Sequence, residues 1–305
     1  MNRTRTGIAL AVATALISGV AIFVNSFGVK EIADAALFTT LKNGVAALAL
    51  LGVALVAVRG RPMPRDLDRR SWAGMTVIGV LGGGLAFLLF FSGLAMASAP
   101  SAAFIHKTLF VWVALLAVPF LGERLGLLQV GALGALLASQ LLITPPTGVV
   151  WGTGETLIAA ATLLWAVEVV LAKRLLAQVD SFVFGVGRLG IGLVVLFGYL
   201  ALTGKLPLVA ELSAAQWSWV LLTGLVLAGY VGTWFAALGR APATVVTSVL
   251  VLGAPITAVL DALAKGSVPA ALPLAGYMLI VAAALALIVS AVRRAQAKTA
   301  QPLGA

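Results

Sequence analysis

Apolar runs of about twenty residues follow one another along the whole chain, and they constrain the fold more than any other feature. Hydrophobic residues make up 62% of the 305 residues, charged residues only 10%, and the mean hydropathy is +1.13. A soluble domain carries about a quarter charged residues, whereas a bilayer-spanning helix needs roughly 20 apolar residues. Because the runs are continuously apolar rather than alternating, membrane β-strands are excluded. The sequence therefore predicts an all-α integral membrane protein.

Ten runs are separated by short segments rich in glycine, proline and charge, which are typical loop signals. The first run is longer than the 7–15-residue apolar core of a signal peptide, so it is predicted to be a helix. We expect ten transmembrane helices near residues 7–27, 35–58, 72–95, 99–121, 125–144, 152–172, 181–202, 217–238, 243–263 and 272–292.

Basic residues are distributed unevenly between the loops. If the N-terminus is cytoplasmic, segments on that side carry 14 of the 20 lysines and arginines and the outer loops carry three. The remaining three, Lys42, Lys107 and Arg188, lie within predicted helices. This bias places both termini in the cytoplasm, at a cell (inner or plasma) membrane. The net charge of +10 then follows topology and requires no nucleic acid.

Two spacings recur in the chain. Asp34 stands eight residues before Lys42, and Asp180 stands eight before Arg188. LAMASAPSAAF at 94–104 also resembles LGRAPATVV at 238–246. The chain is therefore predicted to hold two five-helix repeats, 1–150 and 151–305, and an odd helix number inverts the second repeat. Inverted repeats are typical of alternating-access transporters, whose site lies between the halves.

One long segment resembles the signature of the EamA family of the drug/metabolite transporter superfamily. It is GLAMASAPSAAFIHKTLFVWVALLAVPFLGERL at 93–125, and TLLWAVEVVLAKRL at 162–175 resembles the first helix of a repeat in that family. The resemblance implies a small-molecule permease with a central cavity. The chain departs from the family in Ser18-Gly19, where Trp-Gly is common, and in LAKGSVP at 263–269, where a second Gly-Glu turn is usual. Glu123 is carried over as a structural turn residue only.

Ionisable side chains at membrane depth are the candidates for chemistry, because each costs at least about 2.5–3.5 kcal/mol at the centre of a lone helix. Glu168 and Arg188 have opposite charge and similar expected depth, which predicts an ion pair between neighbouring helices. Lys42 and Lys107 then stay uncompensated in the outer half, unless their ammonium groups reach the outer headgroups. Two unpaired cations in a cavity favour an anionic or carboxylate-bearing solute.

His106, the only histidine, directly precedes Lys107. Neighbouring side chains diverge by about 100° around a helix, so we expect Lys107 to face the cavity and His106 to be packed and hydrogen-bonded. Asn25 is a polar interior position of the first helix, and Trp165 is able to stack on a flat solute, although tryptophan at helix ends more often anchors to the interface. The predicted substrate-binding residues are Lys107, Lys42, His106, Arg188, Glu168, Asn25 and Trp165.

Other function classes fit less well. GVGRLG at 185–190 matches a dinucleotide-binding pattern, but it lies inside an apolar helix, where its glycines favour close helix packing, as do Gly79 and Gly83. One histidine, no cysteine and one deep carboxylate disfavour an intramembrane enzyme and any metal site or cofactor. A non-transporting structural or channel protein stays the other alternative. The sequence predicts a secondary, non-ATP-driven transporter of small organic metabolites such as amino acids, with the lipid bilayer and the solute as partners; a monomer is expected and a dimer is allowed.

Overall fold

The computed structural model describes residues 3–32, 34–57, 68–145 and 151–300. Within these ranges all regular secondary structure is helical and no strand is present, which confirms the all-α prediction. Nine helical segments in the same ranges are long and apolar enough to cross a membrane. The predicted run 125–144 forms a shorter apolar helix of 17 residues, Leu127–Ile143. The chain is an integral membrane protein with nine full-length candidate spans and one short one in its described part.

The helices are, in chain order, α1 (Arg3–Glu31), α2 (Ala35–Ala57), α3 (Arg69–Val80), the π-helix η1 (Leu81–Leu85), α4 (Ala86–Leu94), α5 (Ala99–Lys107), α6 (Leu109–Leu121), α7 (Leu127–Ile143), α8 (Thr153–Leu175), α9 (Ser181–Leu202), the 3₁₀-helix η2 (Leu206–Val209), α10 (Ala214–Leu238), α11 (Ala243–Leu250), α12 (Gly253–Lys265) and α13 (Ala271–Ala300).

Two of the predicted spans are interrupted in the middle. The run 99–121 is divided into α5 and α6 at Thr108, and the run 243–263 is divided into α11 and α12 at 251–252. At each interruption the chain tightens into i→i+3 turns, with Thr108 N–H donating to Ile105 O and Leu252 N–H to Val249 O. The Thr108 hydroxyl also donates to Ile105 O, at 2.6 Å. Because both flanks are strongly apolar, hydropathy alone predicted continuous helices here.

The two interrupted helices repeat each other with a constant displacement. The start of α11, the start and end of α12, and its left-handed glycine, Gly266, each fall 144 residues after the matching points of α5, α6 and Gly122. Asp34 and Asp180, which lie 146 residues apart, share a local role, because each carboxylate accepts a backbone N–H at the start of its helix, from Leu37 and Phe182 respectively. The two halves thus share local structure at the positions that the sequence spacing singled out.

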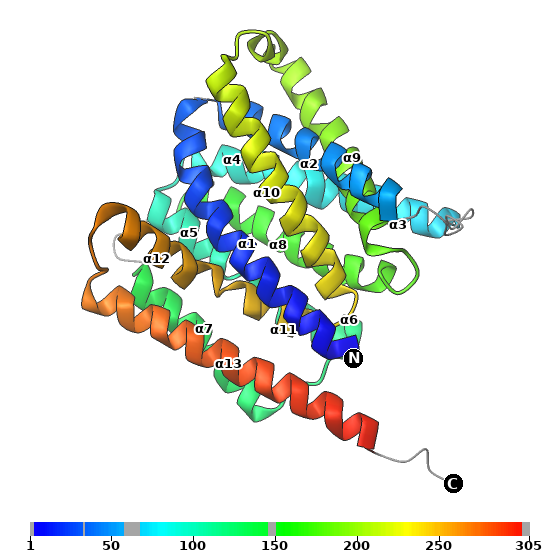
Figure 1. Cartoon of the computed structure of the whole chain (residues 1–305), viewed down its shortest axis with the longest axis vertical. Helices are drawn as coiled ribbons and strands as arrows, with labels where there is room; N and C mark the ends of the chain where they lie inside the picture. Colours follow the sequence, from blue (N-terminus) through cyan, green and yellow to red (C-terminus); the bar gives the residue numbers. More distant parts are fainter. Residues whose placement is uncertain (1–2, 33, 58–67, 146–150, 301–305) are drawn as a thin grey trace.

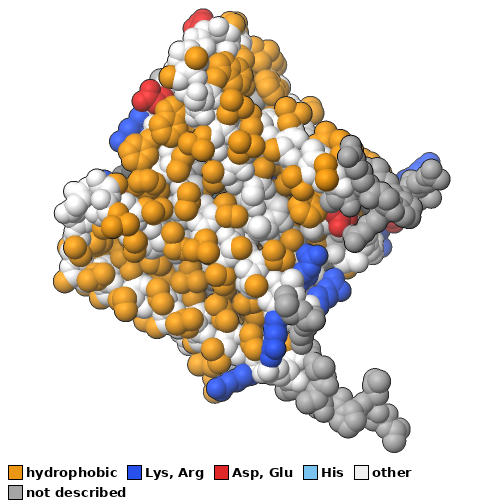
Figure 2. Space-filling view, viewed as in Figure 1, with side chains coloured by type: hydrophobic (Ala, Val, Ile, Leu, Met, Phe, Trp, Pro, Cys, Tyr) orange, Lys and Arg blue, Asp and Glu red, His pale blue; other side chains and the backbone are white. Residues whose placement is uncertain are grey.

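The helices pack in pairs across the two halves. α1 lies along α10, α4 along α8, α2 along α9, and α7 along α13 (Figure 1). The largest buried cluster lies where α1, α8, α9, α10 and α11 meet, and it includes Val169, Phe184, Val231 and Phe235. Large apolar side chains are exposed on the outside, such as Leu127 at 92% and Leu202 at 91%. Figure 2 shows hydrophobic side chains over most of one face, which is the surface expected against lipid.

Lysine and arginine side chains gather at the end of the bundle that holds the start of α1 and the end of α13 (Figures 1 and 2). At this end the ammonium of Lys173 donates to Leu238 O and Ala241 O, at 2.6 and 2.7 Å, and the guanidinium of Arg3 donates to Gly239 O. Arg174 donates to Phe120 O. These cations therefore bind free carbonyl groups at or near the C-terminal ends of helices, where the helix dipole favours positive charge. We call this the basic end.

Candidate functional site

A cavity of about 170 Å³ lies where the two helix interruptions face each other. Both interrupted helices contribute to its wall, together with one face of α1. The lining residues are Ser18 and Ile22 of α1, His106, Lys107, Leu109 and Phe110 around the first interruption, and Thr247, Leu250, Val251, Gly253 and Ala254 around the second. The cavity is thus built from both halves of the chain.

His106 and Lys107 both line this cavity, so the prediction that only Lys107 would face it was wrong. The helix ends at Lys107, and the interruption at Thr108 leaves both side chains beside the open space. The prediction of a hydrogen-bonded His106 was also wrong, because its buried Nδ1 has no hydrogen-bond partner in the described part of the chain. The imidazole packs instead against aromatic rings, with centroids 5.0 Å from Trp165 and 5.2 Å from Phe90.

Lys107 has no acidic partner among the residues that the structure describes. Three ion pairs occur among the described residues: Glu168–Arg188, Asp34–Lys205 and Asp261–Lys265. The Lys107 side chain is partly buried, and the other residues around the cavity carry no negative charge. The cavity therefore presents one ammonium group, with a neighbouring imidazole, inside a wall that is otherwise apolar or hydroxyl-bearing.

An aromatic cluster connects this cavity to a buried polar network. Trp165 touches Phe87 and Phe90 as well as His106, with ring centroids 5.2 and 5.5 Å from the two phenylalanines. The indole N–H of Trp165 donates to Gly82 O at 3.0 Å. Trp165 is therefore a structural link on α8 between the histidine at the cavity and the backbone of η1.

The predicted contact between Glu168 and Arg188 is confirmed. Arg188 Nε donates to Glu168 Oε1 at 2.7 Å, and a terminal nitrogen of the same guanidinium donates to Oε2 at 3.1 Å. That nitrogen also donates to Gly82 O at 3.0 Å, and the guanidinium lies over the Phe87 ring, 5.7 Å from its centroid. Both side chains are buried, at 10% and 7% exposure. Two-pronged geometry with a further acceptor is the arrangement that makes a buried ion pair tolerable.

Gly82 holds this network together from the π-helix η1. A Cβ atom at this position would lie 1.9 Å from Glu168 Oε2, so only glycine leaves room for the carboxylate. The same segment brings Gly83 against Gly192 of α9, where an added Cβ would lie 3.0 Å from the Gly192 Cα. Sequence reasoning identified Gly83 as a packing position but missed Gly82. The run of three glycines in LGGGL was the signal available, because π-turns concentrate at functional sites.

Lys42 and Asn25 are not among the residues that line the cavity. The ammonium of Lys42 lies over the ring of Phe38 on its own helix, 5.3 Å from the centroid. Asn25 Nδ2 donates to Ala21 O at 2.7 Å, and its buried Oδ1 has no partner in the described part of the chain. The substrate-binding roles of both residues stay predictions.

Glu123 joins the two halves at the basic end. It follows Gly122, whose φ of 66° ends α6 in the left-handed conformation. Its two carboxylate oxygens accept the backbone N–H groups of Ala243 and Thr244, which open α11. A carboxylate in this place satisfies orphan donors and complements the helix dipole. Glu123 is thus a turn residue, as expected, and it also caps a helix of the other half, which the sequence did not indicate.

The matching turn at the far end of α12 has Ser267 after Gly266, and no carboxylate follows the glycine. The packing differs in the same sense. α6 packs firmly against α11 beside Glu123, whereas α5 and α12 share at most a marginal contact. The two ends of the interrupted helices are therefore unequal, with the closer association at the basic end.

An all-helical membrane protein whose interrupted helices enclose a small cavity has the architecture of the membrane transporters of small molecules. A family model identifies the family. The model of the EamA-like transporter family matches residues 5–144 and 152–289, and the chain therefore belongs to this family, which is part of the drug/metabolite transporter superfamily. A solved structure titled "Crystal structure of protein" has a TM-score of 0.77 and 19% identity, covering 94% of this chain and 98% of that chain. That similarity shows the fold. No curated protein matches the chain.

Proposed function

We propose that this protein is a secondary, non-ATP-driven transporter of small organic anions, such as carboxylate-bearing metabolites of the amino-acid type. The observation that carries the proposal is Lys107, a cation in a cavity formed by both helix interruptions that has no acidic partner within the described ranges. An ammonium is a point-charge binder for carboxylate. The anion of the substrate would supply the missing charge, which favours binding in a partly dehydrated site.

The remaining site residues have supporting parts in this proposal. His106 lines the cavity, Trp165 packs against the imidazole from outside the lining, and the Glu168–Arg188 pair joins α8 to α9. Lys42 would meet the substrate at another stage of its passage, since it lies outside the cavity lining. Asn25 would offer its Oδ1, which has no partner among the described residues, as an acceptor in the same way.

Alternating access between two inverted five-helix repeats is the mechanism that we propose. The constant displacement of 144 residues between the interrupted helices supports it, and so does the meeting of the end of α6 with the start of α11, which is expected where the two helices run in opposite directions. The closer association at the basic end would make the present conformation closed on that side and more open on the other.

The basic end would face the cytoplasm, with both termini on that side of the cell (inner or plasma) membrane. The gathering of lysine and arginine there supports this orientation. The native chain has no cysteine, so a single Ser267→Cys substitution gives one unique thiol. Its labelling by an impermeant maleimide from the cytoplasmic side alone would contradict the proposed orientation.

Flux in proteoliposomes tests the transport proposal. Thermal-shift screening of the purified protein against carboxylate metabolites would first identify a solute, whose counterflow is then measured with Lys107→Met. We expect at least a tenfold loss of kcat/KM, the equivalent of about 1.4 kcal/mol of lost attraction. Lys265→Met, which removes an exposed lysine, is the control and should transport normally. Wild-type flux and affinity in Lys107→Met would overturn the assignment.

A further inference from the structure

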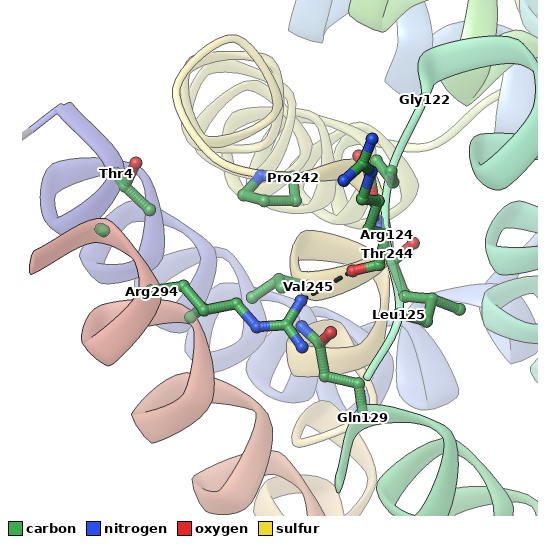
Figure 3. Close-up of a pocket in the computed structure, with 12 residues that line it drawn as sticks. Thr4, Gly122, Arg124, Leu125, Gln129, Pro242, Thr244, Val245 and Arg294 are labelled. Carbon is green, nitrogen blue, oxygen red and sulfur yellow. Dashed lines mark hydrogen bonds between the residues drawn. The ribbon is translucent and has the colours of Figure 1, made fainter. Parts of the chain in front are cut away.

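A second and larger cavity, of about 650 Å³, lies at the basic end. Figure 3 shows it between the turn that follows α6, the start of α11, the last part of α13 and the first turn of α1. It shares no lining residue with the cavity at the helix interruptions. It is therefore a separate space, open to the surface at the level where the arginines gather.

Two arginines from distant parts of the chain line this cavity. Arg294 extends from α13 into the space, and one of its terminal nitrogens donates to the backbone oxygen of Arg124, at 2.7 Å (Figure 3). Arg124 lies on the turn after α6, and its own guanidinium has no hydrogen-bond or ion-pair partner in the described part of the chain. Both guanidinium groups are thus available to an anion at the mouth of one cavity.

The single acid in the lining does not neutralise these arginines. Glu123 has both carboxylate oxygens bound to the backbone N–H groups of Ala243 and Thr244. Its negative charge is therefore balanced by the positive end of α11. The cavity keeps an excess of positive charge around Arg124 and Arg294.

The rest of the wall is mostly apolar and includes Leu125, Val245 and Ala291. Gln129 lies in the wall as well, with its Oε1 accepting Gly126 N–H. A pair of guanidinium groups above an apolar wall matches a phosphate that carries an apolar attachment, because arginine binds phosphate oxygens in a two-pronged manner. Basic pockets between membrane helices on the cytoplasmic side are suited to anionic lipid headgroups.

We propose that this cavity is a binding site for a phosphoryl group, held by Arg124 and Arg294 at the basic end. Its source is either the headgroup of an anionic phospholipid or a soluble phosphate. The site does not depend on the transport proposal, since no residue is shared between the two cavities.

The test uses the purified full-length chain in detergent and measures its unfolding temperature with three additives. They are phosphatidylglycerol, phosphatidylcholine as a zwitterionic lipid, and inorganic phosphate. We expect phosphatidylglycerol to raise the unfolding temperature of the wild type more than phosphatidylcholine does. In the double variant Arg124→Gln/Arg294→Gln that difference should fall by at least half, and the lipid affinity should weaken at least tenfold.

Arg240→Gln is the matched control, because Arg240 is an exposed arginine at the same end that does not line this cavity. It should keep the full response to phosphatidylglycerol. If inorganic phosphate alone gives an arginine-dependent shift, the source is soluble and the proposed site stands. Equal effects of the two lipids without any effect of phosphate, or a full shift in the double variant, would overturn the proposal.

Arg124→Gln alone keeps the test decisive if the double variant does not fold. Its guanidinium supports no described contact, so the fold should tolerate the change, whereas Arg294 anchors the backbone of the turn. Arg124→Gln should lose a clear part of the rise in unfolding temperature that phosphatidylglycerol or inorganic phosphate causes in the wild type. Arg124→Lys should restore some of that rise. A full response in Arg124→Gln would sink the proposal.

Discussion

Glu168 on α8 and Arg188 on α9 form a two-pronged buried ion pair whose guanidinium also binds the backbone of η1 at Gly82. Removing one partner strands a charge away from water, which costs about 3–5 kcal/mol, whereas removing both leaves no uncompensated charge. We therefore expect Glu168→Gln and Arg188→Gln each to destabilise strongly and the double variant to be less destabilised than their sum. Unfolding in detergent measures this cycle. Simple additivity would show that the two side chains are energetically independent.

Gly82→Ala tests the role of the π-helix. The new methyl group would occupy the place of the Glu168 carboxylate, so the ion pair must shift or break. We expect a loss of at least about 2 kcal/mol in stability, the scale of a damaged buried network. Gly198→Ala is the matched control, because a Cβ there meets open space within a helix and should be neutral or stabilising by up to about 1 kcal/mol. Equal melting temperatures of the two variants would refute the steric argument.

Glu123→Gln should weaken closure at the basic end. The amide keeps one acceptor oxygen but loses the charge, which is worth about 1 kcal/mol at a helix start. We expect Thr247→Cys, a position in the wall of the smaller cavity, to react several-fold faster with an impermeant maleimide from the cytoplasmic side in the Glu123→Gln background.

Glu155→Gln is the control for that experiment, because Glu155 caps its own helix by accepting Gly152 N–H and does not join the halves. It should leave the labelling rate of Thr247→Cys unchanged. Identical rates in all three backgrounds would mean that Glu123 does not hold the basic end closed.

The Asp34–Lys205 pair, outside the membrane spans, predicts the pH dependence of stability. Partial burial opposes ionisation of Asp34, but hydrogen bonds from the Lys205 ammonium and the Leu37 N–H together lower its pKa. The hydrogen bond to Asp34 raises the pKa of Lys205. The contribution of Asp34 to the free energy of unfolding is therefore complete above the usual aspartate pKa of about 3.9. It is lost as the pH falls through the lowered pKa that Asp34 has in the folded protein. The contribution of Lys205 to the free energy of unfolding is complete below the usual lysine pKa of about 10.4. It is lost as the pH rises through the raised pKa that Lys205 has in the folded protein.

Asp34→Asn should remove the loss of stability that Asp34 causes as the pH falls. At neutral pH the substitution should lower the stability by at most about 1 kcal/mol, since the pair is partly exposed. Melting temperatures between pH 3 and pH 7 measure the effect. Asp180→Asn changes a carboxylate that has the same capping role but no ion pair among the described residues. It should therefore keep the loss of stability at acid pH that the wild type owes to Asp34. If Asp34→Asn loses stability at acid pH as the wild type does, the Asp34–Lys205 pair does not cause the pH dependence.

Residue type and spacing predicted the parts of this molecule that depend on local chemistry. Run length and composition predicted an all-helical membrane protein, and opposite charges at similar depth predicted the Glu168–Arg188 pair. Hydropathy does not distinguish a continuous helix from an interrupted one, so the turns at Thr108 and at 251–252 were missed. Those turns changed the site most, because they placed His106 beside Lys107 on the cavity wall.

Contacts between distant segments were the other part that the sequence did not indicate. The partner of Glu123 lies 120 positions away, and Gly82 is a necessary glycine only because Glu168 approaches from another helix. Lys42 shows the reverse limit, since its depth and charge suggested a place beside Lys107 that the cavity lining does not include. Depth along a helix is readable from sequence, but the direction that a side chain faces depends on packing.

The unequal capping of α5 and α11 matches the order in which a ribosome makes the chain. α5 is capped locally, because the Ser98 hydroxyl accepts the N–H of Ser101 three residues later. α11 begins after Pro242 without a side-chain cap of its own and takes its acceptors from Glu123. The helix made first thus takes its cap from its own half, and the helix made later enters a membrane where its cap is already present. Domains fold from the N-terminus onward during synthesis. The half that is made first therefore supplies the carboxylate that caps a helix of the half that is made later.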